Sequence, residues 1–158
     1  MSLDYPNPNF TEEVHVDLGT ENVPAGNDEL TITAWINVDN DQLAADQVII
    51  AKSASTGNSG EFKLQVEEPD NELRGIINDN ELTGTTIMGT GVWIFVAMVY
   101  DGVNKVLFID AVQDATEAQT GNVATSADPL IMAGLDDGSV RRSFDGLLAD
   151  IRVYTRAL

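Results

Sequence analysis

Three carboxylates at alternate positions, Glu68, Asp70 and Glu72, have the spacing that best suits catalysis. Hydrolysis of a glycosidic bond with retention needs two carboxyl groups about 5 Å apart, one acting as acid and one as nucleophile. Alternate residues of a strand point to the same side and could supply that pair. However, Pro69 and the pair Asp70-Asn71 are typical of a turn. We therefore expect these side chains to diverge into water, and the sequence indicates a protein that is not an enzyme.

Asp150 is an unusual carboxylate because it interrupts an apolar run between Ala149 and Ile151. A carboxylate close to a hydrophobic core needs a compensating charge or several hydrogen-bond donors. A bound cation would supply that charge. The alternatives are that Asp150 faces solvent or pairs with Arg152.

Arg141 and Arg142 stand out in an acidic chain and follow closely on Asp136 and Asp137. The two guanidinium groups could bind a carboxylated or sulfated glycan, which makes these four residues candidates for ligand binding. The alternative is that the arginines neutralise nearby aspartates. The acidic clusters at 39–41 and 136–138 offer hard oxygen donors to a cation, but neither has the spacing of an EF-hand, and a solvated acidic surface is the favoured interpretation.

The balance of charge excludes several classes of partner. Eight Lys and Arg residues against 26 Asp and Glu residues give a formal net charge of -18 at pH 7, which repels nucleic acid and anionic lipid. The longest apolar runs, such as residues 92–100, are far shorter than the roughly 20 residues that span a membrane. The sole histidine, His15, and the absence of cysteine leave a catalytic triad or zinc centre with one member. We expect no nucleic-acid partner and no membrane insertion.

Alternating apolar and polar residues predict strands along the whole chain, and no window keeps helical spacing. The predicted strands are residues 12–18, 30–38, 47–52, 61–67, 72–78, 81–88, 92–101, 105–113, 129–133 and 144–154. Asp101-Gly102 is typical of a hairpin turn, and the intervening polar segments predict loops at residues 37–46, 53–60, 115–128 and 135–143. This density of strands predicts an all-β, antiparallel sandwich.

Trp35 and Trp93 lie inside predicted strands. An indole ring can bury on the order of 200 Å² between two sheets, and we expect both rings to be buried there. The alternative is that one of them is a stacking platform for a sugar ring.

Three segments carry a family resemblance: Thr31 to Trp35, Trp93 to Gly102, and Phe144 to Leu158. In this order they resemble the T-I-S-A-W, W-x-x-V-A-x-x-Y-D-G and closing F-D-G-x-I-D-x-V-R-x-Y-x-R-A-L segments of laminin G-like domains. These domains belong to the concanavalin A-like jelly rolls. The resemblance implies one jelly-roll domain over residues 1–158, of which residues 1–3 are interpreted as vector-derived.

The same resemblance carries the functional expectations. It implies a non-catalytic carbohydrate-binding or adhesion module of a larger secreted or surface protein, with a glycan or a cell-surface protein as its partner. It also implies a structural Ca²⁺ bound by Asp150 in the closing strand and by the N-terminal segment, where we choose Glu13 among Glu12, Glu13 and Asp17. The alternative function is a structural or assembly module of a cell-surface or viral protein with no glycan ligand. The oligomeric state is left open.

Overall fold

The computed structural model describes residues 3–4, 16–19, 29–39, 45–53, 61–135 and 142–158. In these ranges the chain forms two six-stranded sheets in which every paired strand is antiparallel. Sheet A contains, in spatial order, β1 (Leu3–Asp4), β12 (Gly146–Tyr154), β3 (Leu30–Val38), β8 (Ile94–Tyr100), β9 (Asn104–Ile109) and β10 (Val112–Ala118). Sheet B contains β2 (Val16–Asp17), β11 (Leu130–Met132), β4 (Gln47–Lys52), β5 (Phe62–Glu67), β6 (Glu72–Ile77) and β7 (Asn80–Ile87). The predicted all-β sandwich is confirmed.

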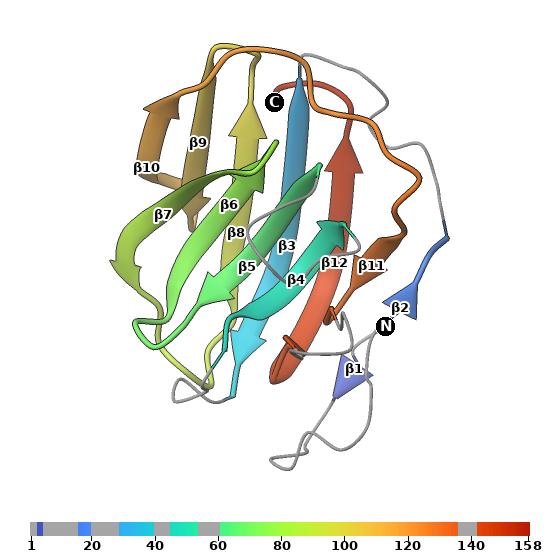
Figure 1. Ribbon diagram of the computed structural model, residues 1–158. Helices are drawn as coiled ribbons and strands as arrows, with labels where there is room; N and C mark the ends of the chain where they lie inside the picture. The colour runs from blue at the N-terminus through green and yellow to red at the C-terminus, as the bar shows by residue number, and fades with distance from the viewer. Residues whose placement is uncertain (1–2, 5–15, 20–28, 40–44, 54–60, 136–141) are drawn as a thin grey trace.

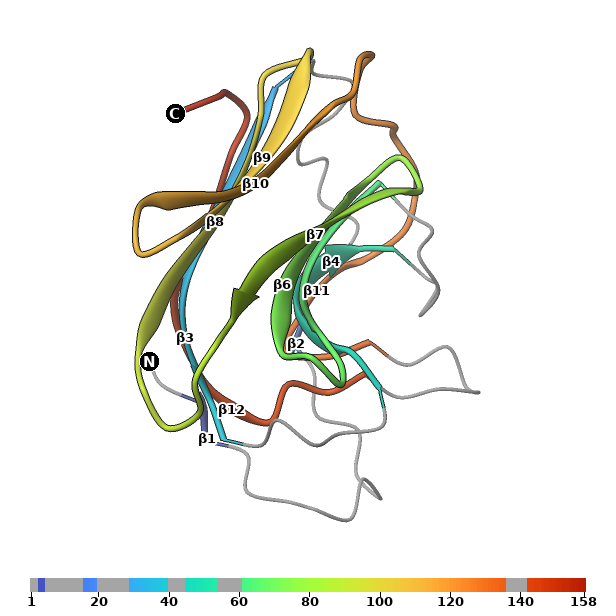
Figure 2. The same cartoon turned by 90° about the vertical axis from the view of Figure 1, so that its left-hand side faces the viewer.

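The two sheets are stacked as layers, with sheet B in front of sheet A in Figure 1 and beside it in Figure 2. Both layers bow in the same direction in Figure 2. The outer surface of sheet B is therefore concave and that of sheet A is convex. No helix long and apolar enough to cross a membrane is present among the described residues.

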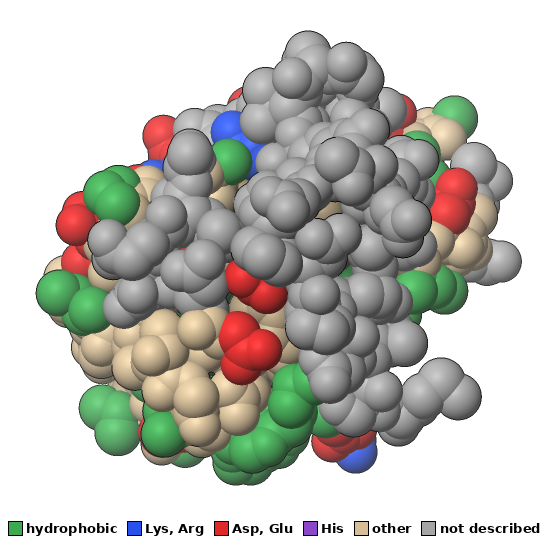
Figure 3. All heavy atoms as spheres, turned by 90° about the horizontal axis from the view of Figure 1, so that it is seen from below, with side chains coloured by type: hydrophobic (Ala, Val, Ile, Leu, Met, Phe, Trp, Pro, Cys, Tyr) green, Lys and Arg blue, Asp and Glu red, His purple; other side chains and the backbone are tan. Residues whose placement is uncertain are grey.

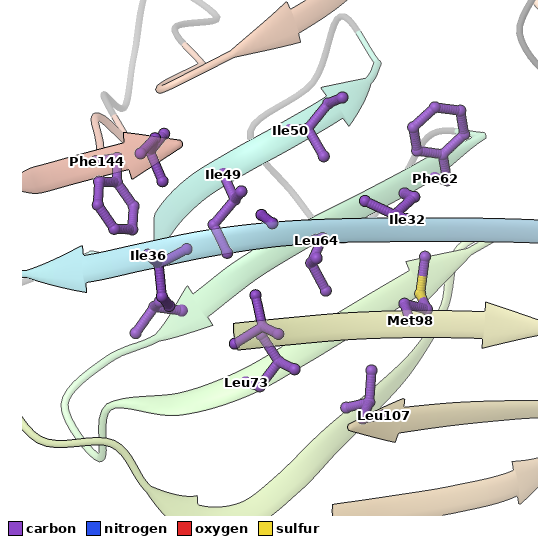
Figure 4. Packing of buried hydrophobic residues seen from close by; sticks show 14 of the residues in the cluster. Ile32, Ile36, Ile49, Ile50, Phe62, Leu64, Leu73, Met98, Leu107 and Phe144 are labelled. Atoms are coloured by element: carbon purple, nitrogen blue, oxygen red, sulfur yellow. The ribbon is translucent and has the colours of Figure 1, made fainter. Parts of the chain in front are cut away.

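The core follows from the two-residue period of the strands. Ile32 and Ile36 of β3 point inward and meet Leu64 of β5 and Leu73 of β6 (Figure 4). All four side chains are fully buried, and each such side chain contributes about 1.5–3 kcal/mol to folding. The intervening residues of each strand point to the outer faces. On sheet B several of these outward side chains, among them Lys63, Gln65 and Ile76, are themselves buried.

All three lysines of the chain are buried, although Lys is normally an exposed residue. Lys52 donates to the Asp128 carbonyl oxygen at 2.8 Å and lies 3.7 Å from a Glu61 carboxylate oxygen. Lys105 donates to the Asn80 carbonyl oxygen at 2.6 Å and pairs with Glu117 at 2.8 Å. Desolvation by burial lowers the pKa of Lys105, and Glu117 opposes that shift. These amines connect parts of the fold that are distant in sequence.

The turns show where sequence patterns succeed and fail. The Asp101-Gly102 turn is confirmed: Gly102 has φ of 82°, and the Asp101 carboxylate accepts from the backbone N–H groups of Val103 and Asn104. Backbone donors to the charged carboxylate lower the pKa of Asp101. The loop predicted to begin at residue 115 is wrong, because β10 extends to Ala118. The preceding turn, at Asp110 and Ala111, has positive φ at both residues without a glycine.

The expected burial of both tryptophans is wrong. Trp35 is 41% exposed and Trp93 is 43% exposed. Trp35 alternates with Ala34 and Ile36, which face the core, so its ring is directed to the outer face of sheet A. There it packs edge-on against Phe95, with ring centroids 5.6 Å apart.

Candidate functional site

A polar network centred on Asp46 lies on the concave outer face of sheet B. Gln65 of β5 is opposite Arg74 of β6 in the strand register, and both point away from the core. Gln65 donates from Nε2 to Asp46 Oδ2 at 2.7 Å, and the backbone N–H of Glu68 donates to Asp46 Oδ1 at 3.2 Å. Asp46 precedes β4 and its side chain is only 11% exposed. Its charge is thus stabilised by donors from β5, from the turn after β5, and from two arginines.

Arg74 and Arg142 both donate to Oδ2 of Asp46, Arg74 at 3.3 Å from Nη1. Arg74 also donates from Nε to the Thr83 hydroxyl at 3.0 Å and pairs through Nη2 with Glu67 at 2.7 Å. The arginine side chains remain 15% and 18% exposed. A planar guanidinium fixed at two or three points is preorganised for ligand oxygens.

Two atoms of this network have no hydrogen-bond partner. They are Oε1 of Gln65 and Nε of Arg142, and both are shielded from water. A buried donor or acceptor without a partner costs about 1–3 kcal/mol, so such atoms call for an explanation. One is an acceptor and the other is a donor. Because both atoms are closed to solvent, a ligand could reach them only if neighbouring side chains moved.

The structure places one of the four residues that the sequence predicts to bind a ligand. Of the four residues predicted to bind a ligand, Arg142 lies in this network, whereas Arg141, Asp136 and Asp137 are outside the described residues. Arg142 is held locally because its backbone donates to the Leu135 carbonyl at 2.9 Å and accepts from Val48 at 3.1 Å. The partner of its side chain is Asp46. A local pattern could not identify Asp46, which is 96 residues away along the chain.

The expectation that the carboxylates around Pro69 diverge is wrong for Asp70 and Glu72 and holds for Glu68. Carboxylate oxygens of Glu67, Asp70 and Glu72 all lie within 4.8 Å of one another. Glu68 instead turns inward and accepts from Gln47 at 2.6 Å. Desolvation, followed by the nearby charges of Asp70 and Glu67, raises the pKa of Glu72. Residues 68–71 do form the predicted turn, but the turn itself brings the ends of β5 and β6 together.

In the view from below in Figure 3, red groups are scattered among the hydrophobic and other described side chains, and blue groups show at fewer places. This agrees with the net charge of -18. The described part of this surface is therefore repellent to polyanions.

Asp150 occupies a different place, at a bulge of β12 on the edge of the sandwich. The β3–β12 register shifts between Ala149 and Arg152, and Asp150 has φ of 52°. Its side chain is 52% exposed and pairs with Arg152 at 2.8 Å, which is the alternative given by the sequence. The cavity beside it, of about 400 Å³, has otherwise apolar lining residues: Val16, Met132, Ala133, Leu148, Ala149 and Ile151. Glu13, the second predicted calcium ligand, lies outside the described residues, as does His15.

Comparison with known families agrees with this architecture. The profile described as the concanavalin A-like lectin/glucanases superfamily matches residues 10–158. The chain belongs to this family. A comparison with curated protein sequences finds no match.

Solved structures similar to this one include several proteins that bind carbohydrate. A protein from Bacteroides ovatus, described as carbohydrate binding on a provisional basis, has a TM-score of 0.77 at 17% identity; the match covers 92% of this chain and 42% of that one. The native heptameric SAP-like pentraxin of Limulus polyphemus has a TM-score of 0.72 at 16% identity, with 99% and 76% covered. The CBM40 of a Ruminococcus gnavus sialidase, bound to α2,3-sialyllactose, has a TM-score of 0.68 at 18% identity, with 84% and 78% covered. At these identities the likeness establishes the fold, and this chain spans less than half the length of the first protein.

Proposed function

We propose that this chain is a non-catalytic carbohydrate-binding or adhesion module of a larger secreted or surface protein, and that the Asp46 network on the concave face of sheet B contacts the glycan. The observation that carries the proposal is the pair of partly exposed guanidinium groups, Arg74 and Arg142, that Asp46 holds in place on this face. Family membership and the carbohydrate-binding neighbours support it.

The chemistry of the network suits an oxygen-rich ligand. Sugar hydroxyls can both donate and accept, and carboxylated or sulfated sugars also offer charged acceptors to a guanidinium. Arg74 and Arg142 are already held by Asp46, so little side-chain entropy is lost when a ligand binds. The acidic surroundings disfavour extended polyanions, and we expect a neutral or singly charged glycan.

The carboxylates of the β5–β6 turn are the residues that would support hydrolysis instead. A retaining pair needs a separation of about 5 Å and an acid with a raised pKa, and Glu72 with its neighbours meets these two conditions. Against catalysis, Glu67 is held by Arg74 and Asp70 is exposed. Glycan cleavage that is lost in Glu72→Gln would overturn the non-catalytic proposal.

The proposal also includes a structural calcium ion at Asp150. The described residues around Asp150 offer few oxygen ligands for it. Among the described residues that line its cavity, Asp150 alone has an oxygen-donating side chain, and Arg152 already holds it. Calcium takes six to eight oxygen ligands, so the others would have to be backbone carbonyls or residues outside the described ranges, such as Glu13. If calcium binds there, adding it raises the melting temperature of the chain but not that of Asp150→Asn; an equal response of both excludes Asp150 as a ligand.

A glycan array followed by calorimetry on the best ligand tests the binding proposal, with and without calcium. Arg142→Lys keeps the charge but loses the planar fork, and we expect it to weaken binding about tenfold. The matched control is Arg152→Lys, which makes the same change at an exposed ion pair on the other sheet. Equal affinities for the two variants would remove the Asp46 network from the proposal. An array with no binding at all would favour a structural or assembly module instead.

A further inference from the structure

Over β3, β8, β9 and β10 the outer face of sheet A carries no described carboxylate. On the other two strands of the sheet, Asp150 pairs with the outward Arg152, and Asp4 is opposite the outward Leu147 in the register. Residues that are opposite one another in the register share a face, so the outward set follows from the pairing of β12, β3, β8, β9 and β10. The outward residues are Thr31, Thr33, Trp35, Asn37, Phe95, Ala97, Val99, Asn104, Val106, Phe108, Gln113, Thr116, Ala118, Leu147, Ala149, Arg152 and Tyr154. We call this surface the neutral face.

The contrast with sheet B makes this composition informative. The chain has 26 Asp and Glu residues and a net charge of -18. The outward positions of sheet B include Asp17, Glu67, Glu72 and Glu81. Two copies of such a chain repel each other wherever their acidic surfaces meet. Of the two outer sheet faces, the neutral face brings fewer described strand carboxylates together, and the exposed one, Asp150, is paired with Arg152.

The neutral face also has the shape and composition of a contact surface. Trp35 is 41% exposed beside Phe95. An open groove of about 290 Å³ runs next to them and is lined by Thr31, Thr33, Phe95, Ala97, Val99, Phe108, Ala111 and Leu158. Aromatic residues are enriched at protein interfaces and charged residues are depleted from their centres. The polar groups in the groove are few: the Thr31 hydroxyl already donates to the Arg156 carbonyl at 2.8 Å. A sugar would find too few partners here, whereas a protein surface would not need them.

We propose that a second copy of this chain docks on the neutral face, so that two copies associate face to face about a two-fold axis. Five strands spaced about 4.8 Å apart and about seven residues long at 3.4 Å each give a face of roughly 600 Å². Two flat faces of this size would bury roughly 1,200 Å², the lower bound for specific complexes, and the convex shape of the face (Figure 2) reduces the contact below that. The dimer is therefore reversible, and it strengthens with salt because salt screens the repulsion between the acidic copies.

Sedimentation equilibrium over a wide range of concentrations tests this proposal with the unmodified chain at low and high salt. We expect a monomer–dimer equilibrium that tightens as salt is added. Trp35→Glu places a charge at the centre of the face and should weaken the dimer roughly thirtyfold. The control, Ile87→Glu, adds the same charge at a position that is 71% exposed on sheet B and should leave the dimer unchanged.

A second readout separates interface burial from misfolding. With Trp93→Phe the only indole is Trp35, whose emission should shift to the blue as concentration rises. With Trp35→Phe the only indole is Trp93, whose emission should stay constant. A chain that remains monomeric at high concentration and salt overturns the proposal, as does a dimer that is indifferent to Trp35→Glu. Quenching of Trp35 by glycan in a monomeric chain would overturn it in favour of a sugar platform.

Discussion

Replacing Asp46 with Asn changes one atom at the centre of the polar network on sheet B. In the native chain Oδ2 of Asp46 accepts from Gln65, Arg74 and Arg142. Asn can keep an acceptor for the Glu68 backbone N–H, but its amide group then faces three donors where a charged acceptor stood. The two guanidinium groups also lose the carboxylate that lies between them.

The expected loss can be bounded from burial. Removing one partner of a buried ion pair costs about 3–5 kcal/mol. The side chains here are 11% to 18% exposed, so water screens part of the remaining charge and we expect the lower end, about 3 kcal/mol. For a chain of this size that corresponds to a fall of roughly 6–12 °C in melting temperature.

Urea unfolding at fixed pH and salt measures this change, provided that the dependence on denaturant is the same for all variants. The control, measured in calcium-free buffer, is Asp150→Asn, which removes the same charge from an exposed pair with Arg152 and should cost far less because water screens that pair. Because both variants lower the net negative charge equally, their difference isolates the local network. A difference below about 1 kcal/mol would show that Asp46 does not organise this face.

Three further predictions concern other parts of the chain. In Gly146→Ala, a Cβ would overlap the Asn37 carbonyl oxygen at a φ of 143°, so we expect a loss of about 3 kcal/mol or more in unfolding free energy; a normal urea midpoint would contradict the close approach. Amine-reactive labelling followed by mass spectrometry should be slow in the folded chain and fast in denaturant at every lysine, because labelling needs local opening; rapid labelling of the folded chain would refute the burial of Lys52, Lys63 and Lys105. The raised pKa of Glu72 means that its carboxyl binds a proton more tightly in the folded chain than in the unfolded chain. The resulting contribution to folding stability is present below pH 4.5 and is lost as pH rises through the folded pKa. Glu72→Gln should therefore gain stability relative to the unmodified chain from pH 4 to pH 7, and urea midpoints at both pH values check the sign.

The strands were predictable because their signal is local. Residues 47–52 match β4 and residues 30–38 match β3 at both ends, since alternation and bounding turn residues act within a few positions. The turn at Asp110-Ala111 was missed for the same reason: alanine is a poor residue for positive φ and gives no turn signal. The prediction of one domain over residues 1–158 stays a prediction.

The tryptophan error shows which sequence signal should take precedence. Trp35 alternates with Ile36 and Ala34, and this period already directed its ring away from the core. The period of the strand, and not the size of the ring, decides on which side of the sheet Trp35 lies. Where a strand has a clear inward set, the position of an aromatic residue in that pattern is the better guide.

The candidate site was the least predictable part, because its members are far apart in sequence. Asp46 meets Gln65, Arg74 and Arg142 across 19, 28 and 96 residues. Asp46 fell in a predicted loop, and nothing in its neighbours indicates a buried charge. Arg142 was identified from its contrast with an acidic background, but its partner follows only from the way β4, β5 and β6 lie side by side.

The two proposals together make a prediction that neither makes alone. If two copies dock through the convex neutral face, their concave faces point in opposite directions (Figure 2). Two sites that face apart cannot bind one flat surface at the same time, so pairing adds no avidity there. They can instead bridge two surfaces. We expect the chain to agglutinate glycan-coated beads, and Trp35→Glu to abolish agglutination while its affinity for the soluble glycan stays unchanged. Arg142→Lys should weaken both. Agglutination by a variant that sedimentation shows to be monomeric would break the link between the neutral face and bridging, whatever the glycan proves to be.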